Sequence, residues 1–536
     1  AESAGDEDKA WLREKIRVST LTRRARRRGG VRGDETVTLA RHAIESLTPK
    51  DVRLRHQWLF QKHWVDESAD ELEEEEIDFR KRDVRIMELR KAALREVLAD
   101  CGLSGVVALA EGGEAANIVG WHLAKVRSGD ELAHDLIALL ARNDFSASLA
   151  LKQMTDGALS SLEGEDQSAV LEKLAASIPD TNASWMLQLF PFRQTTWDLV
   201  AQRGPEIEAA YWRDVYPTWS RQSQAEFSAA IDKLIAIKRP RAAFNMLHLD
   251  MEQVEPRQLF ELMSAIVFKS EEEKGSFQLD QHDIARAFEI LNLNVASSKG
   301  GVIGQGAVSE TEMAALELQY LEALDRGGRR SLSNLERHIE KNPELFIQAV
   351  AFAFKRDDDG EDPPELRVEG SEERSARATS AWRMLQSLQR IPGRDRQGAL
   401  NAKEIEAWVE KVRAGCKELA RSKVGDSCIG KLFSAAPVDD DGVWPVKPVR
   451  DALEAVATTP MSEGVVVGLM NARGVHWRGE GGDQERELAE QYERYAEALR
   501  YTHPRVARMM GELAANYRND ARWQDSEADV RKRLRH

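Results

Sequence analysis

Cysteine is scarce in this sequence, which contains only Cys101, Cys416 and Cys428 among 536 residues. Three thiols so far apart cannot build a disulfide framework or a cysteine-based zinc site. A chain with so few cysteines fits a reducing compartment, and we therefore expect a cytoplasmic protein.

Long apolar runs are also missing. No stretch of 18 or more apolar residues occurs, so no membrane span is predicted. The amino end lacks a signal-peptide pattern and begins AESAGDEDKA without a methionine. We therefore expect a piece of a longer polypeptide or a processed chain. The net charge of −15 argues against a general coat for nucleic acid or membranes, although it leaves local patches open.

The short motifs that carry chemistry are absent as well. The sequence has no H-E-x-x-H, C-x-x-C pair, P-loop, G-x-S-x-G or kinase signature. The nearest approach, GDSCIG around Ser427 and Cys428, has the wrong spacing for a nucleophile elbow. We accordingly expect no catalytic, cofactor or metal site. An enzyme whose active site lies between helices and lacks standard motifs stays open as an alternative.

Apolar residues at helical spacing are plentiful. Phe227, Ile231, Leu234 and Ile235 recur at i, i+4, i+7 and i+8, and similar stripes follow along the chain. Strand-like alternation is rare. The predicted fold is therefore all-α, an irregular α-solenoid of antiparallel helix pairs with a helical carboxyl-terminal cap.

Changes in composition divide the chain into five predicted segments. They are a charged Arg-rich segment (1–35), a helical entry unit with a long charged helix (36–100), a helical-repeat solenoid (101–356), an acidic linker or loop (357–373) and a carboxyl-terminal helical domain (374–536). Pro240 and Pro504 are expected to begin helices. Either Ser309, with Glu312 three residues later, or Thr311 is expected to cap another.

The first segment contains a dense arginine run, TRRARRRGGVRG. Its arginines are Arg23, Arg24, Arg26, Arg27, Arg28 and Arg32. Such an arm can contact phosphate or an acidic partner, which makes a nucleic-acid-associated module the second functional hypothesis. The other interpretation is a solvated stretch whose arginines meet local acids, because no aromatic residues interleave for base stacking.

A cluster of aromatic residues marks a candidate contact surface. Tyr211, Trp212, Tyr216 and Trp219 lie close together, beside Arg213 and Arg221. Exposed tryptophan and arginine are frequent interface anchors, so Tyr211, Trp212, Trp219 and Arg221 form a hypothetical partner-binding set. Internal packing of all four aromatic residues is the alternative.

The stretch TWDLVAQRGPEIEAAYWRDVYPTW, followed by AIDKLIAIKRPRAAFNMLHL, resembles irregular helical repeats of the HEAT/TPR kind. It is also similar to the carboxyl-terminal helical regions of large bacterial multidomain proteins, including STAND-type NTPases and other anti-phage defence proteins. The resemblance implies a non-catalytic sensor or scaffold arm that binds a protein partner, and it transfers no functional residues.

Overall fold

The computed structural model describes residues 5–22, 34–65, 79–217, 223–247, 250–268, 277–297, 307–326, 332–368, 370–395, 398–472 and 481–534. Helices account for 76% of these residues. The one extended pairing within them is an isolated bridge between Arg394 and Leu400. The prediction of an all-α fold is therefore confirmed.

The chain divides into two compact units, Ala1–Leu249 with Ser270–Phe277, and Asp250–Lys269 with Gln278–His536. This division falls inside the region predicted as one repeat array rather than at residues 357–373. The five segments drawn from composition stay a prediction.

The first unit contains helices of up to 33 residues. They are α1 (Asp6–Thr20), α3 (Asp34–Ser46), α4 (Val52–His56), α5 (Phe79–Glu111), α6 (Ala116–Val126), α7 (Gly129–Leu140), α8 (Leu149–Ser160), α9 (Gly164–Ser177), α10 (Asp180–Met186), α11 (Gln194–Ala201), α12 (Pro205–Asp214), α13 (Gln224–Ala236) and α14 (Pro240–Met246). The described residues also contain four single 3₁₀ turns, Gln57–Leu59 and Leu187–Leu189 in this unit and Met251–Gln253 and Pro364–Leu366 in the second.

The second unit continues in the same way. Its helices are α15 (Pro256–Phe268), α16 (Gln281–Ser297), α17 (Glu310–Gln319), α18 (Leu321–Arg326), α19 (Ser333–Lys341), α20 (Pro343–Ala353), α21 (Ser371–Ser387), α22 (Ala402–Glu418), α23 (Ser422–Phe433), α24 (Lys447–Val456), α25 (Thr459–Ala472), α26 (Asp483–Leu499) and α27 (Pro504–Leu534).

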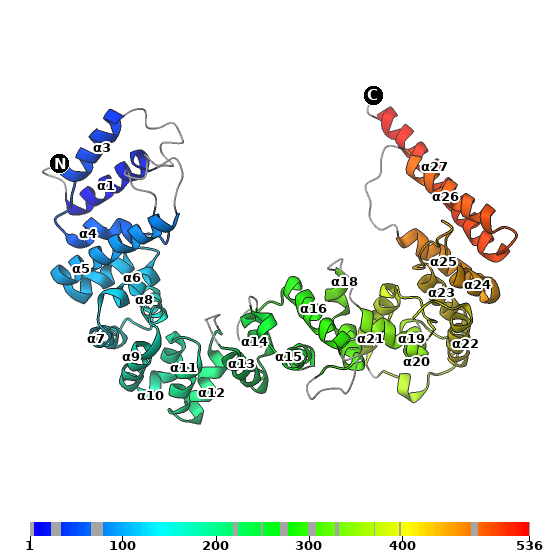
Figure 1. Cartoon of the computed structure of the whole chain (residues 1–536), viewed down its shortest axis with the longest axis horizontal. Coiled ribbons are helices and arrows are strands. Elements are labelled where there is room, and N and C mark those ends of the chain that lie inside the picture. The colour runs from blue at the N-terminus through cyan, green and yellow to red at the C-terminus, as the bar shows by residue number, and fades with distance from the viewer. Residues whose placement is uncertain are drawn as a thin grey trace. The chain divides into compact units, whose positions relative to one another are not determined.

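Packing within each unit joins helices that are close in sequence. In the first unit α6 packs on α8 and α7 on α9; in the second, α17 packs on α19, α23 on α25 and α26 on α27. Figure 1 shows the same succession as a gradual change of colour along the helices of each unit. Each helix therefore covers its apolar stripe mainly with near neighbours in the chain.

Local signals set many helix starts as the sequence predicts. Helix α14 begins at Pro240 and α27 at Pro504, where the missing amide hydrogen costs no helical hydrogen bond. Ser309 caps α17 in a full capping box with Glu312. Its hydroxyl accepts from the Glu312 amide, and the Glu312 carboxylate accepts from the Ser309 amide at 2.9 Å.

The long charged helix predicted within residues 36–100 corresponds in part to α5. Residues 66–78 lie outside the described residues, and α5 begins at Phe79. Gly102 interrupts it with φ of 64° and ψ of −159°, a conformation that suits glycine. The residues that follow this break, up to Glu111, form the rest of α5.

Two helix pairs pack through glycine at close quarters. A Cβ added to Gly120 of α6 would lie 1.8 Å from the Met154 carbonyl oxygen of α8, and one on Gly157 would lie 2.0 Å from the Asn117 oxygen. In the second unit, Gly430 of α23 and Gly464 of α25 repeat the arrangement. Only a residue without a side chain permits backbones to approach so closely.

Most of the predicted linker, residues 357–373, joins α20 to α21, which pack against each other; its last three residues begin α21. Most described residues of this segment are exposed. Asp362 is nevertheless anchored, because it accepts two hydrogen bonds from the buried guanidinium of Arg421, from Nη1 at 2.7 Å and from Nη2 at 2.8 Å. The hydrogen bonds from Arg421 hold the pKa of the Asp362 carboxyl below its ordinary value.

Candidate functional site

A cavity of about 850 Å³ opens between α1, α3, α4 and the end of α5. Its apolar wall includes Leu21, Ile44 and Leu54. These helices are neighbours at the amino end of the first unit, where Figure 1 draws them in blue. The volume lies within the range of about 300–1,000 Å³ typical of small-molecule pockets.

Basic side chains outnumber acidic ones around this cavity. Six basic residues line it, Arg13, Lys15, Arg17, Arg41, Arg53 and Arg55, against three acids, Glu7, Glu14 and Glu45. The excess is notable in a chain whose net charge is −15. A local positive potential of this kind attracts anions even to an acidic protein.

Three of these arginines have acidic partners. Arg17 forms a two-pronged pair with Glu14, from Nε and Nη2 at 2.8 Å each. Arg55 donates from Nη1 to Glu96 at 2.6 Å, and Arg53 lies 3.2 Å from Asp51. Such pairs fix the side chains and neutralise part of the positive charge.

Arg13 differs from them. Its Nη1 atom is buried and has no hydrogen-bond partner among the described residues. Burial first, and then repulsion from the neighbouring Arg55 guanidinium, lowers the pKa of Arg13 below its ordinary value. A guanidinium group held in this way has a donor to offer to an oxyanion.

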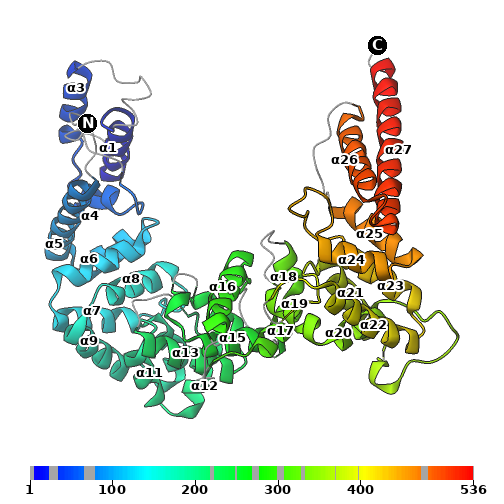
Figure 2. The ribbon, with the colours of Figure 1, turned by 45° about the vertical axis from the view of Figure 1, so that its right-hand side comes forward.

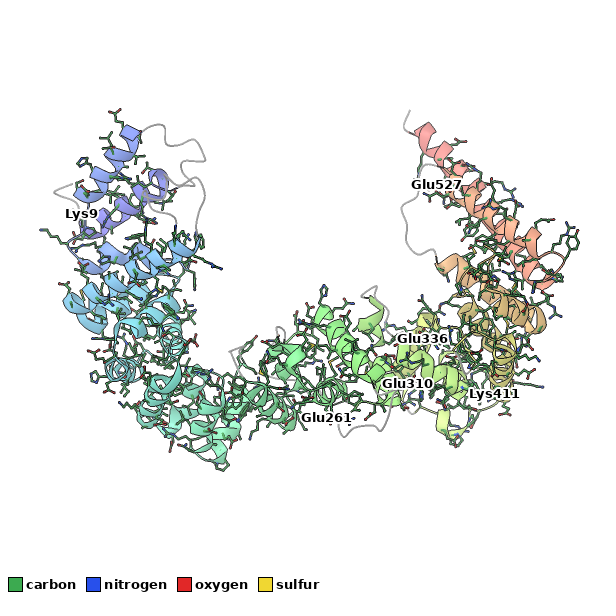
Figure 3. The ribbon with its side chains drawn as sticks, in the orientation of Figure 1. Lys9, Glu261, Glu310, Glu336, Lys411 and Glu527 are labelled. Atoms are coloured by element: carbon green, nitrogen blue, oxygen red, sulfur yellow. The ribbon has the colours of Figure 1, made fainter. Side chains whose placement is uncertain are left out.

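Two indole rings accompany the charges. The guanidinium carbon of Arg17 lies 4.5 Å from the centre of the Trp58 ring, and the Lys15 ammonium lies 5.6 Å from that of Trp11. Trp11 is 61% exposed, and α1 contains no buried side chain. Figure 3 labels Lys9 on the same helix, one turn before Arg13. The cavity therefore combines cations with one largely exposed indole, that of Trp11, and with the partly buried ring of Trp58.

A second unusual surface is the carboxyl-terminal part of α27. Beyond Ala521, none of the described side chains of this helix is buried. Figure 2 shows α27 running past the end of its partner α26, and Figure 3 labels Glu527 on this projecting part. Trp523, which is 63% exposed, and Val530 lie seven residues apart on one face. Glu527 is paired with Arg531 at 2.6 Å.

The aromatic set proposed from the sequence divides into two parts. Tyr211 and Trp212 are buried and pack with Phe192 and Trp197, with ring centres of Trp197 and Trp212 5.4 Å apart. These two side chains are therefore core residues. Tyr216 is 59% exposed, so the alternative of internal packing for all four aromatic residues does not hold. Trp219 and Arg221 lie outside the described residues.

The arginine arm cannot be placed. Arg23, Arg24, Arg26, Arg27, Arg28 and Arg32 all lie outside the described residues. The cavity arginines were missed by sequence reasoning, because they come from separate helices. One local signal was present: Trp11, Arg13 and Arg17 share a single short helix, and Arg13 and Arg17 are four residues apart.

The described part of the chain was compared with the requirements of metal sites and membrane spans at the level of its side chains and helices. No group of three or more His, Cys, Asp or Glu side chains there is placed to hold a metal ion. None of the helices in that part is both long and apolar enough to cross a membrane.

The buried Cys416 and Cys428 have pKa values raised to about 12 by burial.

Comparison with known proteins identifies no relative. No protein family matches the chain, and neither a curated protein nor a solved structure is detectably similar to it.

Proposed function

We propose that the chain is a helical-repeat scaffold or sensor module that binds a protein partner, and that the projecting end of α27 is a contact surface for that partner. The observation that carries this proposal is the exposed pair Trp523 and Val530 on a helix end without buried residues. The succession of neighbouring helix contacts supports an irregular α-solenoid ending in a helical cap.

The projecting helix end has the properties of a docking element. Isolated helices shorter than about 12–15 residues are marginal in water. Here the α26–α27 hairpin supplies the nucleus, since Met510, Leu513 and Tyr517 of α27 are buried within it. The end of α27 is thus presented as a preformed helix, and a partner need not spend free energy on ordering it.

The chemistry of this end indicates the kind of partner. Anchors at i and i+7 fit an apolar groove, in the manner of helix-in-groove recognition. The sequence after Asp529 is rich in bases, with Arg531, Lys532, Arg533 and Arg535. We therefore infer a partner whose groove is apolar at its floor and acidic at its edge.

The resemblance to bacterial multidomain proteins extends the same proposal. On that basis the chain would be the sensing or scaffolding part of a larger defence protein. The nucleic-acid alternative through Arg23–Arg32 stays a prediction. The enzymatic alternative also stays a prediction. No particular contact among the described residues supports either alternative.

The test uses the full chain as bait in cells of its natural source, comparing the wild type with a Trp523→Ala, Val530→Ala double variant. The matched control is Tyr501→Ala, which removes an aromatic side chain that is 86% exposed near the other end of α27. A protein retained by the wild type and the control is then purified and titrated against all three chains.

We expect the double variant to bind that protein at least about tenfold more weakly with an unchanged melting temperature, as for loss of a tryptophan hot spot. Equal binding by all three chains would contradict the proposed surface. Light scattering of the purified chain tests whether a second copy of the chain binds the end of α27 instead of a different protein. Concentration-dependent self-association that Trp523→Ala abolishes would show that it does.

A further inference from the structure

The cavity at the amino end of the first unit contains a feature that packing does not explain. Nη1 of Arg13 is a buried donor without a hydrogen-bond partner in the part of the chain that the structure describes, and the like-charged Arg55 lies nearby. Leaving a charged group without a partner in a partly buried position costs stability. Sites that are maintained against stability are frequently sites of binding.

The oxyanion that fits best is a phosphate group. A guanidinium presents a planar fork of donors that matches phosphate geometry, and several such groups surround this cavity. Arg17 and Arg55 already have carboxylate partners that fix their positions. Arg13 is left with capacity to donate to a ligand.

The rest of the cavity fits a planar, aromatic group. Trp58 and the largely exposed Trp11 both line it, and each ring lies near a cationic side chain. Purine and pyrimidine rings stack on indole and on guanidinium planes, with about 1–3 kcal/mol per stacked base. The volume of about 850 Å³ accommodates a ligand of nucleotide size.

From the unpartnered Arg13 donor, the surrounding arginines and the two indole rings, we infer that this cavity binds a nucleotide, with the phosphate at Arg13 and the base against Trp11 or Trp58. The ligand is either a free nucleotide or a nucleotide within a single strand. The inference is independent of the partner surface on α27, which belongs to the other unit.

The experiment is isothermal titration of the full chain in phosphate-free buffer. The probes are ATP, AMP, adenosine, inorganic phosphate, a ten-residue oligothymidylate and hexaglutamate. The chain is tested as the wild type, Arg13→Met, Trp11→Ala and Arg142→Met. Arg142 is the matched control, because it is an exposed arginine that pairs only with the exposed Asp144 among the described residues.

We expect a nucleotide or the oligothymidylate to bind more tightly than phosphate or adenosine alone, and binding to weaken at least about tenfold in Arg13→Met and several-fold in Trp11→Ala. The control should bind as the wild type does. Tighter binding of the oligothymidylate than of ATP and AMP would assign the ligand to a strand; the reverse order would assign it to a free nucleotide.

A readout that does not need ligand accompanies the titration. Because Nη1 of Arg13 has no hydrogen-bond partner among the described residues and Arg55 repels its charge, Arg13→Met should leave the melting temperature of the free chain unchanged or raise it. A fall in melting temperature would show that Arg13 supports the fold. The inference is overturned if no nucleotide probe binds at about 1 mM, if Arg13→Met and Arg142→Met bind equally well, or if hexaglutamate binds and the nucleotides do not.

Discussion

Asn334, at the start of α19, donates from its side-chain amide to the buried carboxylate of Glu317 on α17, at 2.6 Å. The backbone amides of Asn334 and Leu335 donate to the same carboxylate at 3.1 and 2.7 Å. Glu317 therefore serves as a cap for a neighbouring helix. Despite these donors, burial raises the pKa of Glu317 from 4.5 to about 7.

This shift predicts a stability that falls as the pH rises. The folded state binds the Glu317 proton more tightly than the unfolded state, so its contribution is complete below pH 4.5 and is lost as the pH approaches 7. The loss is at most about 3 kcal/mol. We expect Glu317→Gln to reduce the difference in melting temperature between pH 5 and pH 8. Glu344→Gln on the exposed side of α20 is the control, and an identical pH response in the two variants would refute the assignment.

His122 on α6 predicts the opposite slope. Its Nδ1 donates to the Ile118 carbonyl at 2.9 Å, while burial lowers its pKa to about 4. The folded state then binds the proton less tightly, so its contribution is present above pH 6.5 and is lost as the pH falls towards 4. His122→Phe should flatten the decline in melting temperature between pH 6.5 and pH 4.5, whereas His134→Asn at an exposed position should not. Retention of the full decline in His122→Phe would show that other groups cause it.

The glycine contacts predict that alanine substitutions lower the stability, although alanine has the higher helix propensity. Alanine normally stabilises a helix relative to glycine by roughly 0.5–1 kcal/mol. At Gly120 and Gly464, however, the new Cβ would lie 1.8 and 2.1 Å from a backbone oxygen of the facing helix. Gly120→Ala and Gly464→Ala should therefore lower the melting temperature by several degrees. Gly511→Ala on α27, where nothing lies within 4 Å, should leave it unchanged or raise it; an equal response at all three positions would contradict the contacts.

The burial of the cysteines predicts how many thiols react in the folded chain. Cys416 and Cys428 are buried, with pKa values raised to about 12, whereas Cys101 is partly exposed. The thiolate is the reactive form, so buried thiols of this kind are inert. The hydrogen bond to Asp100 also raises the pKa of Cys101, which slows its reaction without hiding it. We expect an aromatic disulfide reagent at pH 8 to titrate one thiol in the folded chain and three in urea. Rapid reaction of all three without denaturant would show that α22 and α23 open readily.

The sequence predicts the helices well, because period and caps are local properties. The stripe of Ile405, Trp408, Val409 and Val412 becomes the buried face of α22, and Ser309 caps α17. Burial of particular aromatic residues is harder to predict. Tyr211 and Trp212 lie in the core, which depends on contacts with Phe192 and Trp197 of another helix and the loop before it.

The cavity was not predictable for the same physical reason. Arg13 and Arg55 are adjacent only because α1 packs on α4, and no pattern within either helix specifies that contact. The sequence did not predict the glycine contacts either. A helical glycine gives no sign in one sequence of whether it faces solvent, as at Gly511, or a neighbouring backbone, as at Gly120.

The glycine contacts have a mechanical consequence within each unit. Where the backbone of α6 meets that of α8, and α23 meets α25, no side chain lies between them to change rotamer and absorb a displacement. At contacts made through longer side chains, those side chains can adjust. When such a unit is bent or stretched, the deformation should therefore gather in the joints around these two pairs, and each pair should move as a stiff block.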